Sequence, residues 1–164
     1  MRALAAASLA LALGAVLPAQ AATNAGAFSA VQNMVSAYGG LQTVRVIEHF
    51  ENGAMATVDV MPGGQYRVAE TGGEDPSLIV KIATQPVDGA ISTGTYDITP
   101  AGKKTIEGVP TNGYKIASPD GTYQETVWID AKRDLPVTAR VQTQGHTIDV
   151  EYGNYNATPM VATH

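Results

Sequence analysis

Residues 123–155 read YQETVWIDAKRDLPVTARVQTQGHTIDVEYGNY and predict three consecutive β-strands. Between residues 135 and 143, apolar side chains alternate with polar ones, which is typical of a strand with one buried face; the apolar set is Leu135, Val137, Ala139 and Val141. Flanking strands are expected at 122–130 and 146–155. Because the turns between them are short, the three strands should pair in antiparallel order.

The residues before this stretch continue the pattern. Asn52-Gly53 stands between two strand-like runs and is the strongest short-range hairpin signal of the chain. The apolar run 78–83 is too short for periodicity to decide between a buried strand and a short helix. Further strands are expected at 44–50, 55–61, 65–70, 94–98, 103–108 and 113–117.

One amphipathic helix is expected over 27–38, ahead of the strands. Its apolar residues recur at spacings of three and four, and Gly39-Gly40 supplies a C-terminal stop. The sequence therefore predicts a mainly β fold with an N-terminal helix and a meandering antiparallel sheet of about eight to ten strands.

Residues 1–21 have the pattern of a secretory signal peptide. A positive start at Met1-Arg2 and a short apolar run lead to the small-x-small end Ala19-Gln20-Ala21. We expect cleavage after Ala21, a single domain over 22–156 and a flexible tail over 157–164. Export favours a periplasmic location, with full secretion as the alternative.

Composition narrows the function classes. A formal net charge of −5 repels phosphate backbones, so no nucleic-acid partner is expected. The chain has no cysteine, so residue 22 offers no site for a lipid anchor. No apolar segment after the signal approaches the roughly 20 residues of a spanning helix, so we expect a protein that is neither lipid-anchored nor membrane-spanning.

No catalytic or metal-binding motif stands out. The sequence has no G-x-S-x-G, S-x-x-K or H-E-x-x-H pattern. Glu48 and His49 are neighbours, but adjacent strand residues point to opposite faces. We therefore expect a protein that is not an enzyme and that needs no cofactor or metal.

Two groups of residues resemble the LolA/LolB-like superfamily of periplasmic lipoprotein carriers. In the C-terminal half these are 127–130 (VWID), 135–137 (LPV), Gly145 and a last strand ending at Tyr155; in the N-terminal half, Pro62 precedes the pair Tyr66-Arg67. The superfamily also includes mycobacterial lipid-binding lipoproteins and a sensor domain of an anti-sigma-factor regulator. The resemblance implies a curved antiparallel sheet that forms an unclosed half-barrel around the helix.

A single curved sheet has one concave apolar face, and this favours a cavity for an apolar ligand such as a lipid or an acyl chain. The helix would form one wall of that cavity and the strands the other. The expected lining residues are Phe28, Val31, Met34, Val46, Phe50, Val58, Val60, Met61, Tyr66, Val137 and Val141.

An alternative is a protein–protein interaction or sensor module of the cell envelope with a filled core. The carriers have a functional Arg immediately before the Pro, and here that position is Met61. Trp128 shares its strand face with polar residues, which favours a partner contact or a rim position. Trp128 and Arg67 are the expected partner-contacting residues.

Overall fold

Eight antiparallel strands form one sheet in the computed structural model, which describes residues 24–87 and 95–156. The order across the sheet is β3-β2-β1-β8-β7-β6-β5-β4, so the last strand lies beside the first. The strands are β1 (Val44–Phe50), β2 (Met55–Val60), β3 (Tyr66–Glu70), β4 (Asp97–Ile106), β5 (Val109–Ala117), β6 (Tyr123–Asp130), β7 (Pro136–Thr143) and β8 (His146–Gly153). The expected signal peptide (1–21) and tail (157–164) lie outside the described residues.

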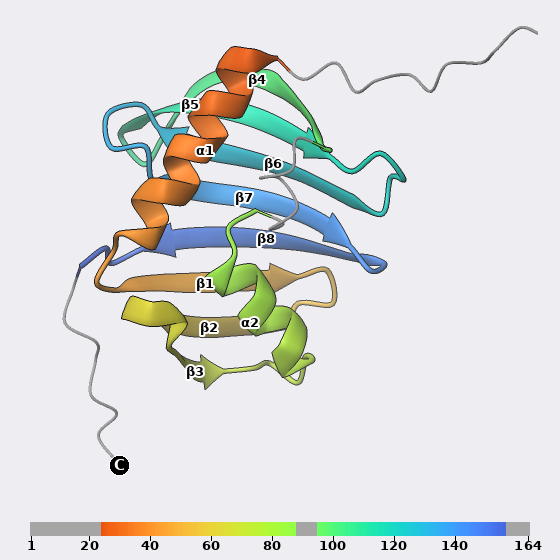
Figure 1. Ribbon diagram of the computed structural model, residues 1–164. Helices are drawn as coiled ribbons and strands as arrows, with labels where there is room; N and C mark the ends of the chain where they lie inside the picture. Colours follow the sequence, from red (N-terminus) through yellow and green to blue (C-terminus); the bar gives the residue numbers. More distant parts are fainter. Residues whose placement is uncertain (1–23, 88–94, 157–164) are drawn as a thin grey trace, which may run out of the picture.

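Two helices cover the same side of this sheet (Figure 1). Helix α1 (Ala25–Gly39) crosses it, and its buried side chains are Ala27, Val31, Met34 and Tyr38. The Asn24 side chain caps α1 by accepting a hydrogen bond from the Ala27 amide at 3.0 Å. A short 3-10 turn, η1 (Pro62–Gly64), links β2 to β3.

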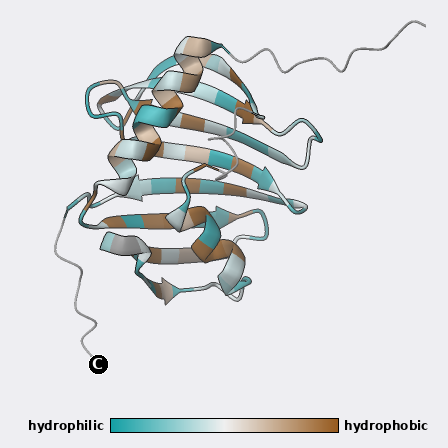
Figure 2. Ribbon diagram, viewed as in Figure 1, coloured by the Kyte–Doolittle hydropathy of each residue, from teal (hydrophilic) through white to brown (hydrophobic). Residues whose placement is uncertain are grey.

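Helix α2 (Pro76–Thr84) packs against β2 and β3. Asp75 caps it by accepting a hydrogen bond from the Ser77 amide at 2.8 Å, and Pro76 occupies the first turn, where its missing N–H costs nothing. The apolar residues Leu78, Ile79, Ile82 and Ala83 face inward. Figure 2 shows hydrophobic residues, in brown, on α2 and along the strands behind the helices.

The mainly β class, the N-terminal helix and the unclosed antiparallel sheet predicted from the sequence are confirmed. The prediction of one helix was wrong, since the described residues contain two. The run 78–83 is helical because the Asp75-Pro76 cap starts a helix there.

The two short strands expected at 94–98 and 103–108 are one strand, β4. A β-bulge between Pro100 and Gly102 carries the strand past the proline. Gly102 has φ +102°, which suits glycine. Strand β4 lies at the edge of the sheet, where a proline breaks no ladder of hydrogen bonds on its free side.

Candidate ligand-binding site on the concave side

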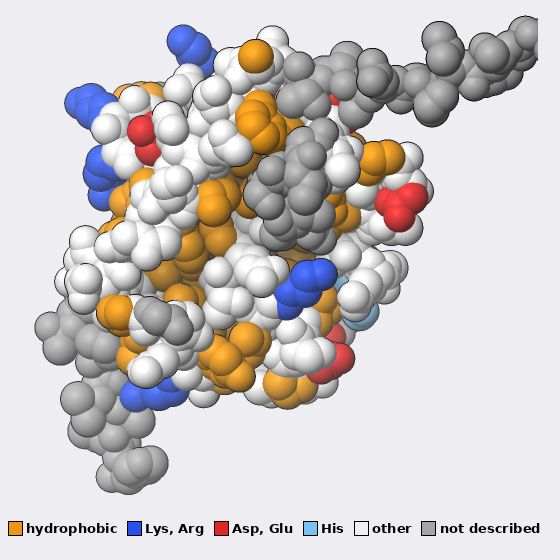
Figure 3. All heavy atoms as spheres, viewed as in Figure 1, with side chains coloured by type: hydrophobic (Ala, Val, Ile, Leu, Met, Phe, Trp, Pro, Cys, Tyr) orange, Lys and Arg blue, Asp and Glu red, His pale blue; other side chains and the backbone are white. Residues whose placement is uncertain are grey.

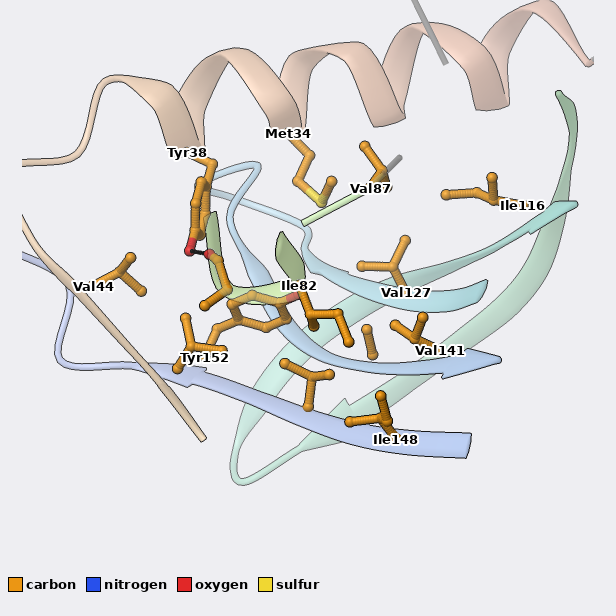
Figure 4. Packing of buried hydrophobic residues seen from close by; sticks show 14 of the residues in the cluster. Met34, Tyr38, Val44, Ile82, Val87, Ile116, Val127, Val141, Ile148 and Tyr152 are labelled. Atoms are coloured by element: carbon orange, nitrogen blue, oxygen red, sulfur yellow. Dashed lines mark hydrogen bonds between the residues drawn. The ribbon is translucent and has the colours of Figure 1, made fainter. Parts of the chain in front are cut away.

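The helices and the concave side of the sheet enclose one apolar core. Met34 from α1 and Ile82 from α2 point toward Tyr152 of β8, with Val127 and Val141 beyond (Figure 4). Val31, Met34, Val46 and Val58 have no exposed surface at all. If the expected lining residues are placed as predicted, they should lie in this core.

Most of the expected lining residues lie in this core. Phe28 is half-buried and packs against its margin. Met61 is half-buried beyond the end of β2, and Tyr66 on the edge strand β3 is 50% exposed. The expected residues that are buried in the core are Val31, Met34, Val46, Phe50, Val58, Val60 and Val141.

Val137 is the exception, and its expected inward position was wrong. Trp128 pairs with Thr138 while Ile129 pairs with Pro136, so Val137 is the extra residue of a β-bulge. It lines a hollow together with Ile47 and Glu151, whose neighbours along their strands face the core. The extra residue shifts the alternation by one position, so Pro136 is buried before the bulge and Ala139 after it, while Val137 is not. The sequence pattern gives no sign of this shift.

The space left inside the core is small. A cavity of about 20 Å³ lies between α2 and strands β6 to β8, close to the roughly 10–15 Å³ that one buried water needs. Apolar residues make most of its lining, which comprises Leu78, Lys81, Ile82, Gln85, Pro86, Tyr123, Val141, Thr143 and Tyr152. A chain-like ligand can enter only if α2 or its side chains move.

The apolar interior comes to the surface beside the helices. Figure 3 views the molecule from the helix side, and hydrophobic side chains gather there between α1 and α2. A hydrogen bond links these two helices: the Tyr38 hydroxyl of α1 donates to the Ala83 carbonyl of α2 at 2.6 Å. Tyr38 also meets Tyr152 edge to face, with ring centroids 5.9 Å apart.

Polar groups are buried within this apolar core. Glu48 of β1 has no exposed surface, and neither of its carboxyl oxygens has a hydrogen-bond partner among the described residues. Burial raises the pKa of Glu48 to about 8 from the ordinary 4.5, because a low-dielectric surrounding disfavours the charged form. The Glu125 carboxylate of β6 accepts a hydrogen bond from the Tyr123 hydroxyl.

Tyr152 completes this group of buried polar side chains. Its hydroxyl is buried and has no partner among the described residues. Burial raises its pKa well above the usual value, and the nearby Glu125 and Glu48 carboxyls raise it further. Most residues of the concave interior are thus apolar, and a few ionisable side chains are buried among them.

Sequence reasoning missed the α2 residues and the two inward glutamates. The Asp75-Pro76 pair was a usable signal for the helix start. Glu48 occupies an inward position of the series Val44, Val46, Glu48, Phe50, so the period-2 pattern contained the information that a carboxyl faces the core.

The outer face of the sheet carries Trp128. Its six-membered ring packs over Gly113 on the adjacent strand, and the Lys104 ammonium lies 3.9 Å from the ring centroid. Beside it is a shallow hollow of about 580 Å³, whose lining includes Arg140 and Asp149. Trp128 is therefore half-buried on the side of the sheet away from the helices.

Arg67, the second expected partner residue, is engaged in an ion-pair row. Asp59 of β2 is 5% exposed and lies between Arg45 of β1 and Arg67 of β3. The Arg45 Nε lies 2.8 Å from one carboxylate oxygen, and an Arg67 nitrogen lies 3.6 Å from the other. Such a row across three strands fixes their register as well as presenting charge.

Within the described ranges, no group of three acidic, cysteine or histidine side chains could hold a metal ion. In the same ranges, no helix combines the length and the apolar character that crossing a membrane requires.

Comparison with solved structures assigns the fold. The lipoprotein LppX of Mycobacterium tuberculosis superposes with a TM-score of 0.60 at 16% identity, over 85% of this chain and 100% of that chain. LprF of Mycobacterium bovis gives 0.56 at 15% identity, over 86% and 98% of the two chains. The chain shares the fold of these two proteins, in agreement with the open half-barrel that the resemblance to the LolA/LolB-like superfamily implied.

A third structure, MucB, superposes with a TM-score of 0.52 at 13% identity, over 86% of this chain and 61% of that chain. The fold of this chain thus matches nearly the whole of two mycobacterial structures and part of a third, MucB. No protein-family model matches the sequence, and no curated protein matches it in sequence.

Proposed function

We propose that this LolA/LolB-like protein is a non-enzymatic periplasmic protein, exported by a signal peptide, that binds a lipid or an acyl chain on the concave side of its sheet. The observation that carries the proposal is the apolar interior that opens between α1 and α2, with its small cavity against β6 to β8. The likeness to the lipoprotein LppX supports it at the level of fold.

Ligand entry requires α2 to give way. Leu78, Ile79 and Ile82 are its large buried side chains, and exposing three such side chains costs roughly 5–9 kcal/mol. Each buried methylene of a ligand returns roughly 0.8 kcal/mol. An acyl chain of about a dozen methylenes is therefore long enough to offset the movement, whereas short apolar molecules are not.

The test is uptake of a fluorescent fatty acid or phospholipid by the delipidated protein. We expect saturable uptake by the wild type. The Val141→Phe variant fills the cavity beside α2 and should bind at least about tenfold more weakly. No uptake by folded wild-type protein would contradict the proposal.

A matched control comes from the next residue of the same strand. Gln142 is exposed and points to the opposite face from Val141. The Gln142→Phe variant introduces the same side chain outside the core, so it should keep wild-type uptake. Equal loss in both variants would mean that the Phe acts through the strand and not through the cavity.

A second candidate function is contact with an envelope protein through the outer face. The observation that favours it is Trp128 beside the hollow that also exposes Arg140 and Asp149. Under this alternative, Trp128→Ala removes specific partners from a pull-down of envelope proteins while uptake of fluorescent lipid stays unchanged. An identical set of captured proteins would count against it.

A further inference from the structure

Two buried polar side chains of the concave interior lack partners among the described residues. Glu48 is fully buried with both carboxyl oxygens unbonded, and Tyr152 is 7% exposed with its hydroxyl unbonded. Buried polar groups are nearly always hydrogen-bonded, to protein, water or ligand. Leaving one unbonded is costly, so both groups call for a partner that the described chain does not supply.

The two groups lie on neighbouring strands and face the same side. Glu48 of β1 is opposite Val150 of β8, and Tyr152 follows two residues later on the face of Val150. Tyr152 also lines the small cavity, and Figure 4 shows its ring next to Ile82. Tyr152 therefore borders the space into which a ligand would extend.

The neighbouring tyrosine hydroxyls do not bond to Glu48 or Tyr152. The Tyr38 hydroxyl already donates to the Ala83 carbonyl, and the Tyr123 hydroxyl donates to Glu125. Glu48 keeps its proton below a pKa of about 8, so an anionic group buried between Glu48 and Tyr152 would lose its hydration without gaining an opposite charge from either side chain. The interior instead suits a group that donates hydrogen bonds.

Building on the proposed function, we propose that the bound amphiphile carries a hydrogen-bond donor, a hydroxyl or an ammonium, that is held between Glu48 and Tyr152. The apolar chain then lies between α2 and the strands, with the donor group inside the protein. Carboxylate and phosphate amphiphiles are the disfavoured class. Specificity arises because a site built to bond a donor leaves its own polar groups unbonded when the donor is missing.

The test compares matched amphiphiles of one chain length. Hexadecanol, hexadecylamine, hexadecyl methyl ether and palmitate compete in an equal mixture, and native mass spectrometry reads the occupancy of each. We expect the alcohol, the amine or both to exceed the ether and palmitate by about tenfold. Relative occupancy of the alcohol and the amine identifies which donor the site takes.

Two variants assign the preference to this site. Glu48→Leu removes the carboxyl, and Tyr152→Phe removes only the hydroxyl and keeps the ring against Tyr38. Each should reduce the preference for the donor over the ether while chain uptake persists. The second variant keeps the test decisive if the first does not fold, since it leaves the packing in place.

The possible failures are distinct. Equal binding of all four compounds, or a preference for palmitate, overturns this inference and leaves the proposed function standing. A donor preference that survives in both variants also overturns it, because the donor is then held elsewhere. Failure of the folded wild type to bind any of the four overturns the proposed function itself.

Discussion

Gly113 makes room for Trp128, the single tryptophan of the chain. A Cβ added at Gly113 would lie 2.6 Å from a carbon of the Trp128 ring, and its backbone φ is ordinary. Gly113→Ala should therefore push the indole away from the sheet and lower stability by about 1–3 kcal/mol. Thermal unfolding measures the loss, and the fluorescence of the single Trp reports the displacement.

Gly153→Ala is the control for this substitution. Gly153 also lies in a strand, and nothing stands within 4 Å of its added Cβ. It should change neither the melting temperature nor the Trp emission by much. If Gly113→Ala also leaves both unchanged, Trp128 does not pack on Gly113 as described.

Glu48 makes stability depend on pH. Its folded-state pKa, about 8, lies above the ordinary 4.5, so between these values the unfolded chain loses a proton that the folded chain keeps. Stability therefore falls as pH rises through this window, by roughly 1.4 kcal/mol per pH unit, and levels off above it. Glu48→Gln removes this dependence, so its stability relative to wild type should rise by about 2–4 kcal/mol from pH 5 to pH 8.

Urea unfolding at several pH values measures this difference. Glu70→Gln serves as the matched control, because Glu70 is exposed on the edge strand β3 and should follow the wild-type profile. Parallel profiles for wild type and Glu48→Gln would show that Glu48 titrates alike in the folded and unfolded chain.

At the level of elements, α2 is the part whose movement the proposed function needs. The Tyr38 hydroxyl ties its last turn to α1. Tyr38→Phe removes this hydrogen bond, worth about 0.5–1.5 kcal/mol, and should speed amide exchange over 76–84. It should also speed the uptake of an acyl chain.

Tyr155→Phe is the comparable change away from α2. The Tyr155 hydroxyl donates to the Pro136 carbonyl at the start of β7. Its loss should reduce stability without faster exchange in α2 or faster uptake. If amide exchange in α2 is equally fast in both variants and the wild type, the Tyr38 hydroxyl does not hold α2 against α1.

The sequence predicted the elements whose periodicity is strong. Strands β1, β6 and β7 and helix α1 follow from alternation or from three-and-four spacing. Two features escaped because they depend on single residues: the Asp75-Pro76 cap that makes α2, and the bulge at Val137 that reverses its side. A bulge is defined by the register between two paired strands, so the pattern of one strand alone does not predict it.

For the whole molecule, the sequence predicted the open sheet and most of the apolar residues on its concave side. It did not predict that side chains would fill the concave side and leave only a small cavity. The residues that fill it come from α2, which the pattern left undecided, and from inward polar residues such as Glu48. Filling depends on how elements far apart in sequence pack together, and a residue pattern does not report that. The two candidate functions accordingly belong to opposite faces: the apolar interior, and the outer face around Trp128.

The most direct test of the central claim is native mass spectrometry of the protein purified from its own cell envelope, followed by extraction of any bound mass. We predict a stoichiometric adduct of one apolar-chain molecule per protein, lost in Val141→Phe and kept in Gln142→Phe. A clean mass for the unliganded protein that persists after challenge with lipids would contradict the claim and favour the outer face as the functional surface.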